Sequence, residues 1–280
     1  MVSPVLINGC ADGAISPMDR GLAYGDGLFE SIRFVGERAP LWQRHMQRLA
    51  EGCRRLQLPE PDTELLWREA YEVSRDFPQS VVRITLTRGV GERGYAPPSA
   101  PSPTRMVAAF APPPVDEDGY LFGVHARVCE LRLARQPRLA GIKHLNRLEQ
   151  VLARAEWADP SIAEGLLCDE EGSVISATMA NIFAVIGGAL CTPALDCCGI
   201  AGVARAEVLA QFPQTRIEAI SLDALRQANE IFFSSSVRGI MPVKSLDNCA
   251  YAPGEITRVL QQHWRELGFV QAALSMEQVG

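Results

Sequence analysis

The spacing of hydrophobic residues predicts two amphipathic helices in the first third of the chain. In residues 42–58 arginine and glutamine fill one side of the helical repeat, and apolar residues recur on the other at steps of three or four: Met46, Leu49, Cys53 and Leu56. This period is typical of a helix that buries one face. A second helix is expected after Pro61, with Asp62 or Thr63 as its N-cap.

Alternating and β-branched segments predict strands around these helices. We expect a short strand and turn in residues 5–13, a hairpin in residues 27–40, and strands at residues 81–89 and 106–111. The last two are separated by a Gly/Pro-rich stretch from Gly89 to Pro103, which is long enough to indicate a functional loop.

Residues 111–119 contain three consecutive prolines and an acidic run, and they are the best candidate for a linker. We therefore expect an N-terminal α+β domain at residues 1–114 and a C-terminal domain at residues 115–280. Strands and helices in the second half are spaced too irregularly for simple βαβ winding. The prediction is an α+β fold whose second domain has a mixed or barrel-like sheet.

Composition narrows the class of protein. Hydrophobic residues are 47%, charged residues 21% and the mean hydropathy is +0.02, as in ordinary globular proteins. A net charge of -6 and a pI near 5.4 argue against a nucleic-acid partner. Neither a signal peptide nor an apolar run of roughly 20 residues is present, so a cytoplasmic protein without membrane contact is expected.

The cysteines and histidines point to no metal site. The eight cysteines form no CxxC pair, and we expect them to be mostly reduced. The alternative that adjacent Cys197 and Cys198 form a redox pair is disfavoured by disulfide geometry. The four histidines have no metal-binding spacing either.

Lys143 is the leading candidate for chemistry. It precedes a segment predicted to be helical, whose apolar residues are expected to face a core: Leu145, Leu148, Val151, Leu152 and Ala155. A lysine at the edge of a packed element is partly desolvated, which lowers its pKa and favours the neutral amine that reacts with carbonyl groups. The alternative reading is an ordinary surface lysine at a helix start.

Seven segments together carry a resemblance to a known family. They are DRGLAYGDGLFESIR, RHMQRL, TRGVGERGY, GIKHLNRLEQVL, MANIF, GIAGVAR and EIFFSSSVRGIMPV. In order and approximate spacing they resemble the fold-type-IV pyridoxal phosphate (PLP) family, which includes branched-chain and D-amino-acid aminotransferases, and the lysine segment looks like that of its aminodeoxychorismate lyases. The resemblance implies a smaller N-terminal α/β domain, a larger PLP-binding domain, and a Schiff base between PLP and Lys143.

The resemblance also implies a set of cofactor ligands. Arg48 would grip the PLP phosphate, although the helix carries other arginines and Arg48 alone reads as a surface residue. Backbone N–H groups at a helix start would form a phosphate cup at Gly202, Val203 and Ala204. The family often has a hydroxyl where Ala204 stands. A phosphate-binding hydroxyl is expected at Ser236, with Ser234 and Ser235 as alternatives.

One departure from the family concerns the pyridine nitrogen of PLP. Most relatives carry a glutamate five residues before the asparagine of the NxF motif, whereas this chain has Ser176. A hydroxyl holds a proton on that nitrogen less well than a carboxylate does, which favours a lyase over a transaminase. Thr178 or a water molecule is an alternative partner.

The implied reaction converts 4-amino-4-deoxychorismate to 4-aminobenzoate and pyruvate, a step of folate biosynthesis, with Lys143 as the acid–base group. The two substrate carboxylates call for cations and hydrogen-bond donors, and the candidates are Arg93, Tyr95, Arg33 and Arg238. Relatives are homodimers, so a homodimer is expected. The alternatives are an aminotransferase of the same fold and a binding protein on a decayed enzyme scaffold.

Overall fold

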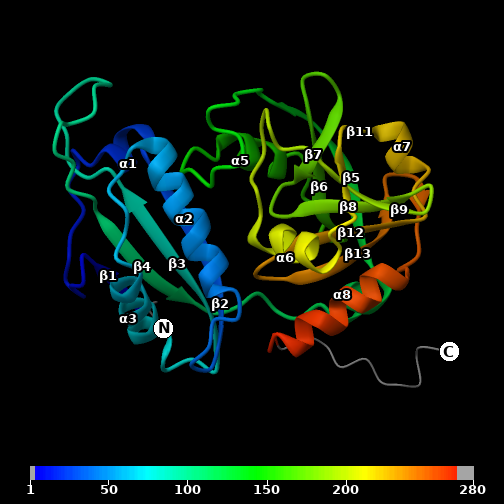
Figure 1. Ribbon diagram of the computed structural model, residues 1–280, viewed down its shortest axis with the longest axis horizontal. Helices are drawn as coiled ribbons and strands as arrows, with labels where there is room; N and C mark the ends of the chain where they lie inside the picture. Colours follow the sequence, from blue (N-terminus) through cyan, green and yellow to red (C-terminus); the bar gives the residue numbers. More distant parts are fainter. Residues whose placement is uncertain (1–3, 270–280) are drawn as a thin grey trace. The chain divides into compact units, whose positions relative to one another are not determined.

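The computed structural model describes residues 4–269, which divide into two compact units (Figure 1). Unit 1 holds the described residues up to Pro112 together with Ile142–Arg147, and unit 2 holds Pro113–Gly141 and the described residues from Leu148 onward. The main division lies two residues before the expected boundary. A single boundary leaves out residues 142–147, which return to unit 1 because they hydrogen-bond to the edge of its sheet.

Unit 1 contains an antiparallel sheet with the order β1-β4-β3-β2. Its strands are β1 (Val5–Ile7), β2 (Gly27–Val35), β3 (Gln79–Thr87) and β4 (Arg105–Phe110). The expected hairpin in residues 27–40 is confirmed as strand β2 and a Gly36–Glu37 turn closed by a single antiparallel bridge between Val35 and Arg38. The long partner of β2 is β3, which pairs with it along its whole length, and the chain after the turn leads into a helix. The free edge of β2 is bonded by residues 142–147: the Phe29 N–H donates to the Lys143 carbonyl at 3.1 Å, and the Leu145 N–H donates to the Gly27 carbonyl at 3.0 Å.

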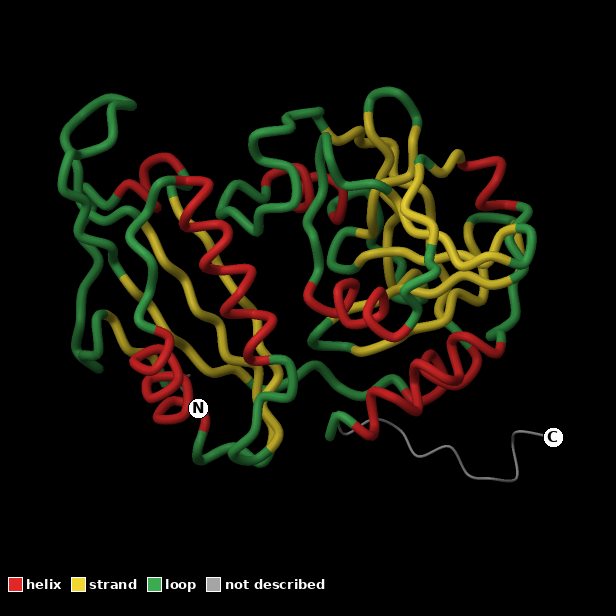
Figure 2. Tube along the Cα trace, viewed as in Figure 1, coloured by secondary structure: helices red, strands yellow, loops and turns green. Residues whose placement is uncertain are grey.

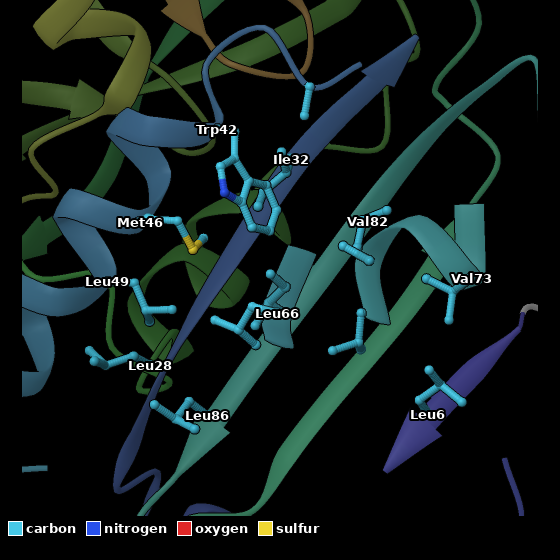
Figure 3. Close-up of a cluster of buried hydrophobic side chains, with 14 of the residues drawn as sticks. Leu6, Leu28, Ile32, Trp42, Met46, Leu49, Leu66, Val73, Val82 and Leu86 are labelled. Carbon is cyan, nitrogen blue, oxygen red and sulfur yellow. The ribbon is translucent and has the colours of Figure 1, made fainter. Parts of the chain in front are cut away.

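Two helices cover one face of this sheet (Figure 3). The helices of unit 1 are α1 (Arg20–Tyr24), α2 (Trp42–Leu56) and α3 (Thr63–Ser74). The predicted apolar stripe of α2 is buried, and the Asp62 side chain caps α3 by accepting from the Glu64 and Leu65 N–H groups. Even-numbered positions of β2 and β3 complete the core: Leu28, Ile32, Phe34, Val82, Ile84 and Leu86. Each of these fully buried side chains contributes roughly 1.5–3 kcal/mol.

Unit 2 contains a mixed, barrel-like sheet, as expected (Figure 2). The strands are β5 (Val124–Leu133), β6 (Ile162–Asp169), β7 (Ser173–Ala177), β8 (Asn181–Ile186), β9 (Ala189–Pro193), β10 (Arg216–Glu218), β11 (Ile220–Ser221), β12 (Glu230–Ser235), β13 (Gly239–Leu246) and β14 (Cys249–Ala250). Their order is β10-β9-β8-β12-β13-β5-β6-β7-β11, with β14 added on β13. Pairs β5–β13, β5–β6 and β9–β10 are parallel and the others are antiparallel.

The helices of unit 2 are α4 (Glu117–Phe122), α5 (Leu148–Arg154), α6 (Val203–Gln211), α7 (Leu222–Arg226) and α8 (Glu255–Glu266). The acidic run of the predicted linker starts α4, with Asp116 as N-cap, so part of that segment is helical. None of the helices in residues 4–269 is long and apolar enough to cross a membrane. All eight cysteines are free thiols, and five are buried: Cys53, Cys129, Cys168, Cys191 and Cys198.

The helix after Lys143 differs from its prediction. It starts at Leu148, five residues beyond the lysine, and only Ala153 of its residues is buried. The apolar side chains expected to face a core are largely exposed: Leu148 by 75%, Val151 by 59% and Leu152 by 61%. Periodicity indicates a helix but does not say what covers its apolar side, and within this chain that side of α5 stays in solvent.

Candidate active site

Lys143 lies in the part of unit 1 that extends the sheet at β2. Its ammonium nitrogen is 4.3 Å from the centre of the Phe29 ring. Burial and the positive charge of Arg48 lower the pKa of Lys143 to about 7, although the nearby Glu30 carboxylate opposes this shift. At neutral pH a large fraction of the side chain is therefore the neutral amine, which is the nucleophilic form.

A buried ion pair connects β2 with α2 beside this lysine. Arg48 donates to both carboxylate oxygens of Glu30, at 2.8 and 2.5 Å, and His45 lies 2.6 Å from the same carboxylate. Burial alone would raise the pKa of Glu30, but Arg48 and His45 outweigh it and lower the pKa to about 2. The pKa of His45 is lowered by burial, so a neutral imidazole donates from Nδ1. The pair orients the Arg48 guanidinium through a bidentate contact.

A second cation approaches the ring of Phe29. The guanidinium carbon of Arg83, from the middle of β3, lies 4.2 Å from the ring centre. Arg83 is on the face of the sheet opposite to α2 and is exposed, and burial of part of its side chain lowers its pKa. Phe29 thus carries two basic groups, Lys143 and Arg83, and together they make this place attractive for an anion.

In unit 2 a loop leads into the N-terminus of α6. Gly202 is the N-cap and no side chain caps the helix, which leaves the first N–H groups of α6 available to a ligand. Asn181, at the start of β8, donates from its side chain to the Ile200 carbonyl at 2.9 Å. A Cβ at position 202 would lie 2.0 Å from the Asn181 side-chain oxygen, so only glycine fits there.

The same loop is bonded to the chain just before the lysine. The Gly141 N–H donates to the Gly199 carbonyl at 2.9 Å, and the Ala201 N–H donates to the Gly141 carbonyl at 3.1 Å. Gly141 precedes Lys143 by two residues in sequence. Hydrogen bonds therefore link the MANIF segment to the GIAGVAR segment, and the GIAGVAR segment to Gly141, just before the lysine segment.

The three serines at the end of β12 have different environments: Ser234 and Ser235 are its last two residues, and Ser236 follows it. The Ser234 hydroxyl is buried and has no hydrogen-bond partner within residues 4–269. The Ser235 hydroxyl accepts from the Val237 and Arg238 N–H groups at 3.3 and 3.4 Å, and so it closes the turn. Ser236 lies in that turn and is partly exposed.

Ser176, the residue expected at the pyridine nitrogen, is a buried residue of β7. A different carboxyl group lies near the end of this strand. Glu164 of β6 accepts from the Thr178 hydroxyl and from the N–H groups of Thr178 and Gly165. Burial outweighs these hydrogen bonds and raises the pKa of Glu164.

The four predicted substrate residues are placed differently from one another. Arg33 is buried in β2 and donates to the Gln79 side chain. Arg93 and Tyr95 are exposed on the loop between β3 and β4, and Tyr95 is 85% exposed. Arg238 is exposed in the turn between β12 and β13.

Several residues of this environment were not selected from the sequence. Glu30 had a detectable signal, because it is the charged residue in phase with Leu28, Ile32 and Phe34 in a strand with one buried face. Arg83 interrupts an apolar strand in the same way on the other face. Glu164 had no local signal, since its partner Thr178 is 14 residues away.

The chain is similar in sequence and in structure to known proteins. Residues 27–246 match the family described as amino-transferase class IV. Aminodeoxychorismate lyase of Vibrio harveyi is 33% identical over 263 residues, covering 91% of this chain and 97% of its own. A putative branched-chain-amino-acid aminotransferase of Methanocaldococcus jannaschii is 30% identical, covering 91% and 92%. The crystal structure of 4-amino-4-deoxychorismate lyase from Pseudomonas aeruginosa has a TM-score of 0.89 at 43% identity, over 94% of this chain and 98% of that one.

Proposed function

The chain belongs to the class IV aminotransferase family, and on this premise we propose that it is a lyase that converts 4-amino-4-deoxychorismate to 4-aminobenzoate and pyruvate. The cofactor is pyridoxal phosphate, as expected from the family. The observation that carries the proposal is the similarity to two aminodeoxychorismate lyases, at 33% and 43% identity. The position of the Lys143 amine over the Phe29 ring supports it.

The residues present fit a phosphate-bearing aldehyde. Unit 1 offers the Lys143 amine, whose pKa of about 7 suits bonding to an aldehyde, and the oriented guanidinium of Arg48. Unit 2 offers the uncapped N-terminus of α6 at Gly202, Val203 and Ala204, with Ser236 as a further donor. When bound, the cofactor supplies an aldehyde that bonds to amines and a ring that withdraws electrons from the carbon next to the bound nitrogen.

Lys143 has two roles in this proposal. Its amine holds the cofactor covalently at rest, and in turnover the same amine moves the proton at C4 of the substrate. The C–O bond to the enolpyruvyl group breaks, pyruvate leaves, and the six-membered ring becomes aromatic, so no second substrate is needed. If Ser176 faces the pyridine nitrogen, as the family resemblance implies, its hydroxyl would support a protonated ring less than a carboxylate would, which suits a reaction driven by aromatisation.

The two carboxylates of the substrate need positive partners. We add Arg83 to the candidates Arg33, Arg93, Tyr95 and Arg238, because Arg83 lies on the same aromatic ring as Lys143 and is exposed. Arg33 already donates to Gln79, which makes it the weakest of the five candidates.

We further propose that the enzyme is a cytoplasmic homodimer that serves folate biosynthesis.

The test is pyruvate release from 4-amino-4-deoxychorismate by PLP-loaded protein with no 2-oxo acid present. Lys143→Ala should abolish turnover and the borohydride-fixed PLP adduct, whereas the matched variant Lys244→Arg should retain both. An aminotransferase is the alternative function. It would be identified by amino-group transfer from an amino acid to a 2-oxo acid that is faster than pyruvate release.

A further inference from the structure

The loop between β3 and β4, residues 88–104, is held at its base by Asp19. The Thr87 N–H donates to the Thr104 carbonyl at 3.0 Å, which closes the loop. The Asp19 carboxylate accepts from the hydroxyl groups of both threonines, at 2.9 and 2.6 Å. Asp19 is almost completely buried and also caps α1 through the Gly21 N–H. The two ends of the loop are therefore fixed to the start of α1.

Arg20, the next residue, holds the distal part of the same loop. Its guanidinium donates to three successive carbonyls, of Gly94 at 3.1 Å, Tyr95 at 3.1 Å and Ala96 at 3.3 Å. Its Nε–H donates to Asp26 at 2.9 Å. Arg20 is 4% exposed, so these contacts are made largely out of water, where charge-assisted hydrogen bonds are strong.

Packing adds to this attachment. The Arg20 guanidinium lies 5.0 Å from the centre of the Tyr24 ring, and Tyr24 lies 5.4 Å from the ring of Tyr95. The side chain of Arg20 runs against Gly91, where an added Cβ would be 2.8 Å from its Cδ. The loop has no helix or regular strand of its own. The Gly94 N–H also donates to the Tyr24 hydroxyl at 3.3 Å, so residues 94–96 are held by Arg20 and Tyr24, and Arg20 supplies three of the hydrogen bonds.

We propose that Arg20 is a positioning residue for substrate binding: by holding the carbonyls of residues 94–96 it fixes the place at which the exposed side chains of Arg93 and Tyr95 meet a carboxylate of the substrate. The inference rests on the proposed function, because it takes Arg93 and Tyr95 as substrate-binding. Arg20 itself is buried and four of its five guanidinium N–H groups bond to protein groups, so its role is to position the loop and not to contact the substrate.

The test uses Arg20→Met in the PLP-loaded full-length enzyme, with the exposed Arg38→Met as the matched control. Gly91→Ala is a milder second variant that displaces Arg20 without removing its charge. Two quantities are measured: hydrogen–deuterium exchange of peptides spanning residues 89–103, and KM and kcat for 4-amino-4-deoxychorismate. Arg20→Lys tests whether a charge without the planar fork restores function.

Arg20→Met should speed exchange in residues 89–103 and raise KM roughly tenfold or more, the scale of one lost charge-assisted contact, with kcat and the PLP dissociation constant within about twofold. Gly91→Ala should change the same quantities less, Arg20→Lys should recover only part of the loss, and Arg38→Met should change none. Unchanged loop exchange, or a loss confined to kcat or PLP binding, would overturn the proposal. If the wild-type enzyme releases no pyruvate, the proposed function fails, and the exchange measurement still decides whether Arg20 holds the loop.

Discussion

Lys143 is one of only two lysines in the chain, the other being Lys244, whereas arginine supplies the remaining basic residues. Lys244 is exposed in β13 of unit 2. The scarcity of lysine makes the chemistry of Lys143 easy to follow, because an amine-specific reagent has two side-chain targets. The exposed Lys244 amine also serves as an internal reference in every labelling experiment.

The first prediction concerns the protonation of Lys143. Its pKa is lowered from the ordinary 10.5 to about 7, so the amine is protonated below pH 7 and neutral above it. In the cofactor-free protein, acylation of Lys143 should rise with pH through a midpoint near 7 and then level off. Mass spectrometry of the peptides measures this rate, with the Lys244 peptide correcting for reagent reactivity. A midpoint near 10 would contradict the prediction.

The second prediction concerns Glu30. Its carboxylate stabilises the Lys143 ammonium, so Glu30→Gln should move the acylation midpoint of Lys143 below pH 7. The variant should also lose about 1–3 kcal/mol of stability, because Arg48 loses its buried charged partner. The stabilising contribution of Glu30 is fully present above its ordinary pKa of 4.5 and is lost as the pH falls towards 2. Urea denaturation at pH 7 measures the loss, and exposed Glu72→Gln is the control. If the pH midpoint of Lys143 acylation is the same in Glu30→Gln as in the wild type, Glu30 does not act on the lysine.

At the scale of elements, the loop before α6 depends on a fit between Asn181 and Gly202. Gly202→Ala should weaken PLP binding because the new Cβ collides with the Asn181 oxygen. Asn181→Ala should also weaken it, because the Ile200 carbonyl loses its donor. In the double variant the collision is absent, so its loss should be clearly smaller than the sum of the single losses. PLP titration of the wild type, the two single variants and the double variant measures this coupling. If the two losses in binding free energy simply add, Gly202 and Asn181 do not fit against each other directly.

The elements also show which structural features can be predicted from sequence. The helices α2 and α3 follow from local signals, because each buries one apolar face in its own unit and Asp62 caps α3. The pairing of β2 with β3 does not, because 43 residues separate the end of β2 from the start of β3 and local signals do not record distant partners. The lysine and the loop before α6 were predicted through family resemblance, whereas Glu164 with Thr178 and Arg20 with residues 94–96 are contacts that only the folded chain reveals.

At the scale of the whole molecule, the exposed side of α5 bears on assembly. Three large apolar side chains on a seven-residue helix are an unusual surface for an isolated subunit, and we expect them to be covered in the proposed homodimer. Leu152→Lys should lower the mass measured by light scattering at micromolar concentration from about twice 30.6 kDa towards 30.6 kDa. Val259→Lys, at an exposed apolar position of α8, is the control. A wild-type mass of 30.6 kDa would refute the dimer, and a dimeric Leu152→Lys variant would exclude α5 from its interface.

The return of residues 142–147 to unit 1 has a consequence for biosynthesis. The sheet of unit 1 is complete except for the edge of β2 once residue 112 has been made, and the segment that bonds to that edge ends at residue 147. At translation rates of about 5–20 residues per second, these 35 residues take roughly 2–7 s. During that interval the Gly27–Phe29 end of β2 presents unpaired backbone groups, the kind of edge at which nascent chains associate wrongly. The segment that pairs with the Gly27–Phe29 end of this edge is the one that carries Lys143, so the reactive amine takes its place in the same step that covers these backbone groups.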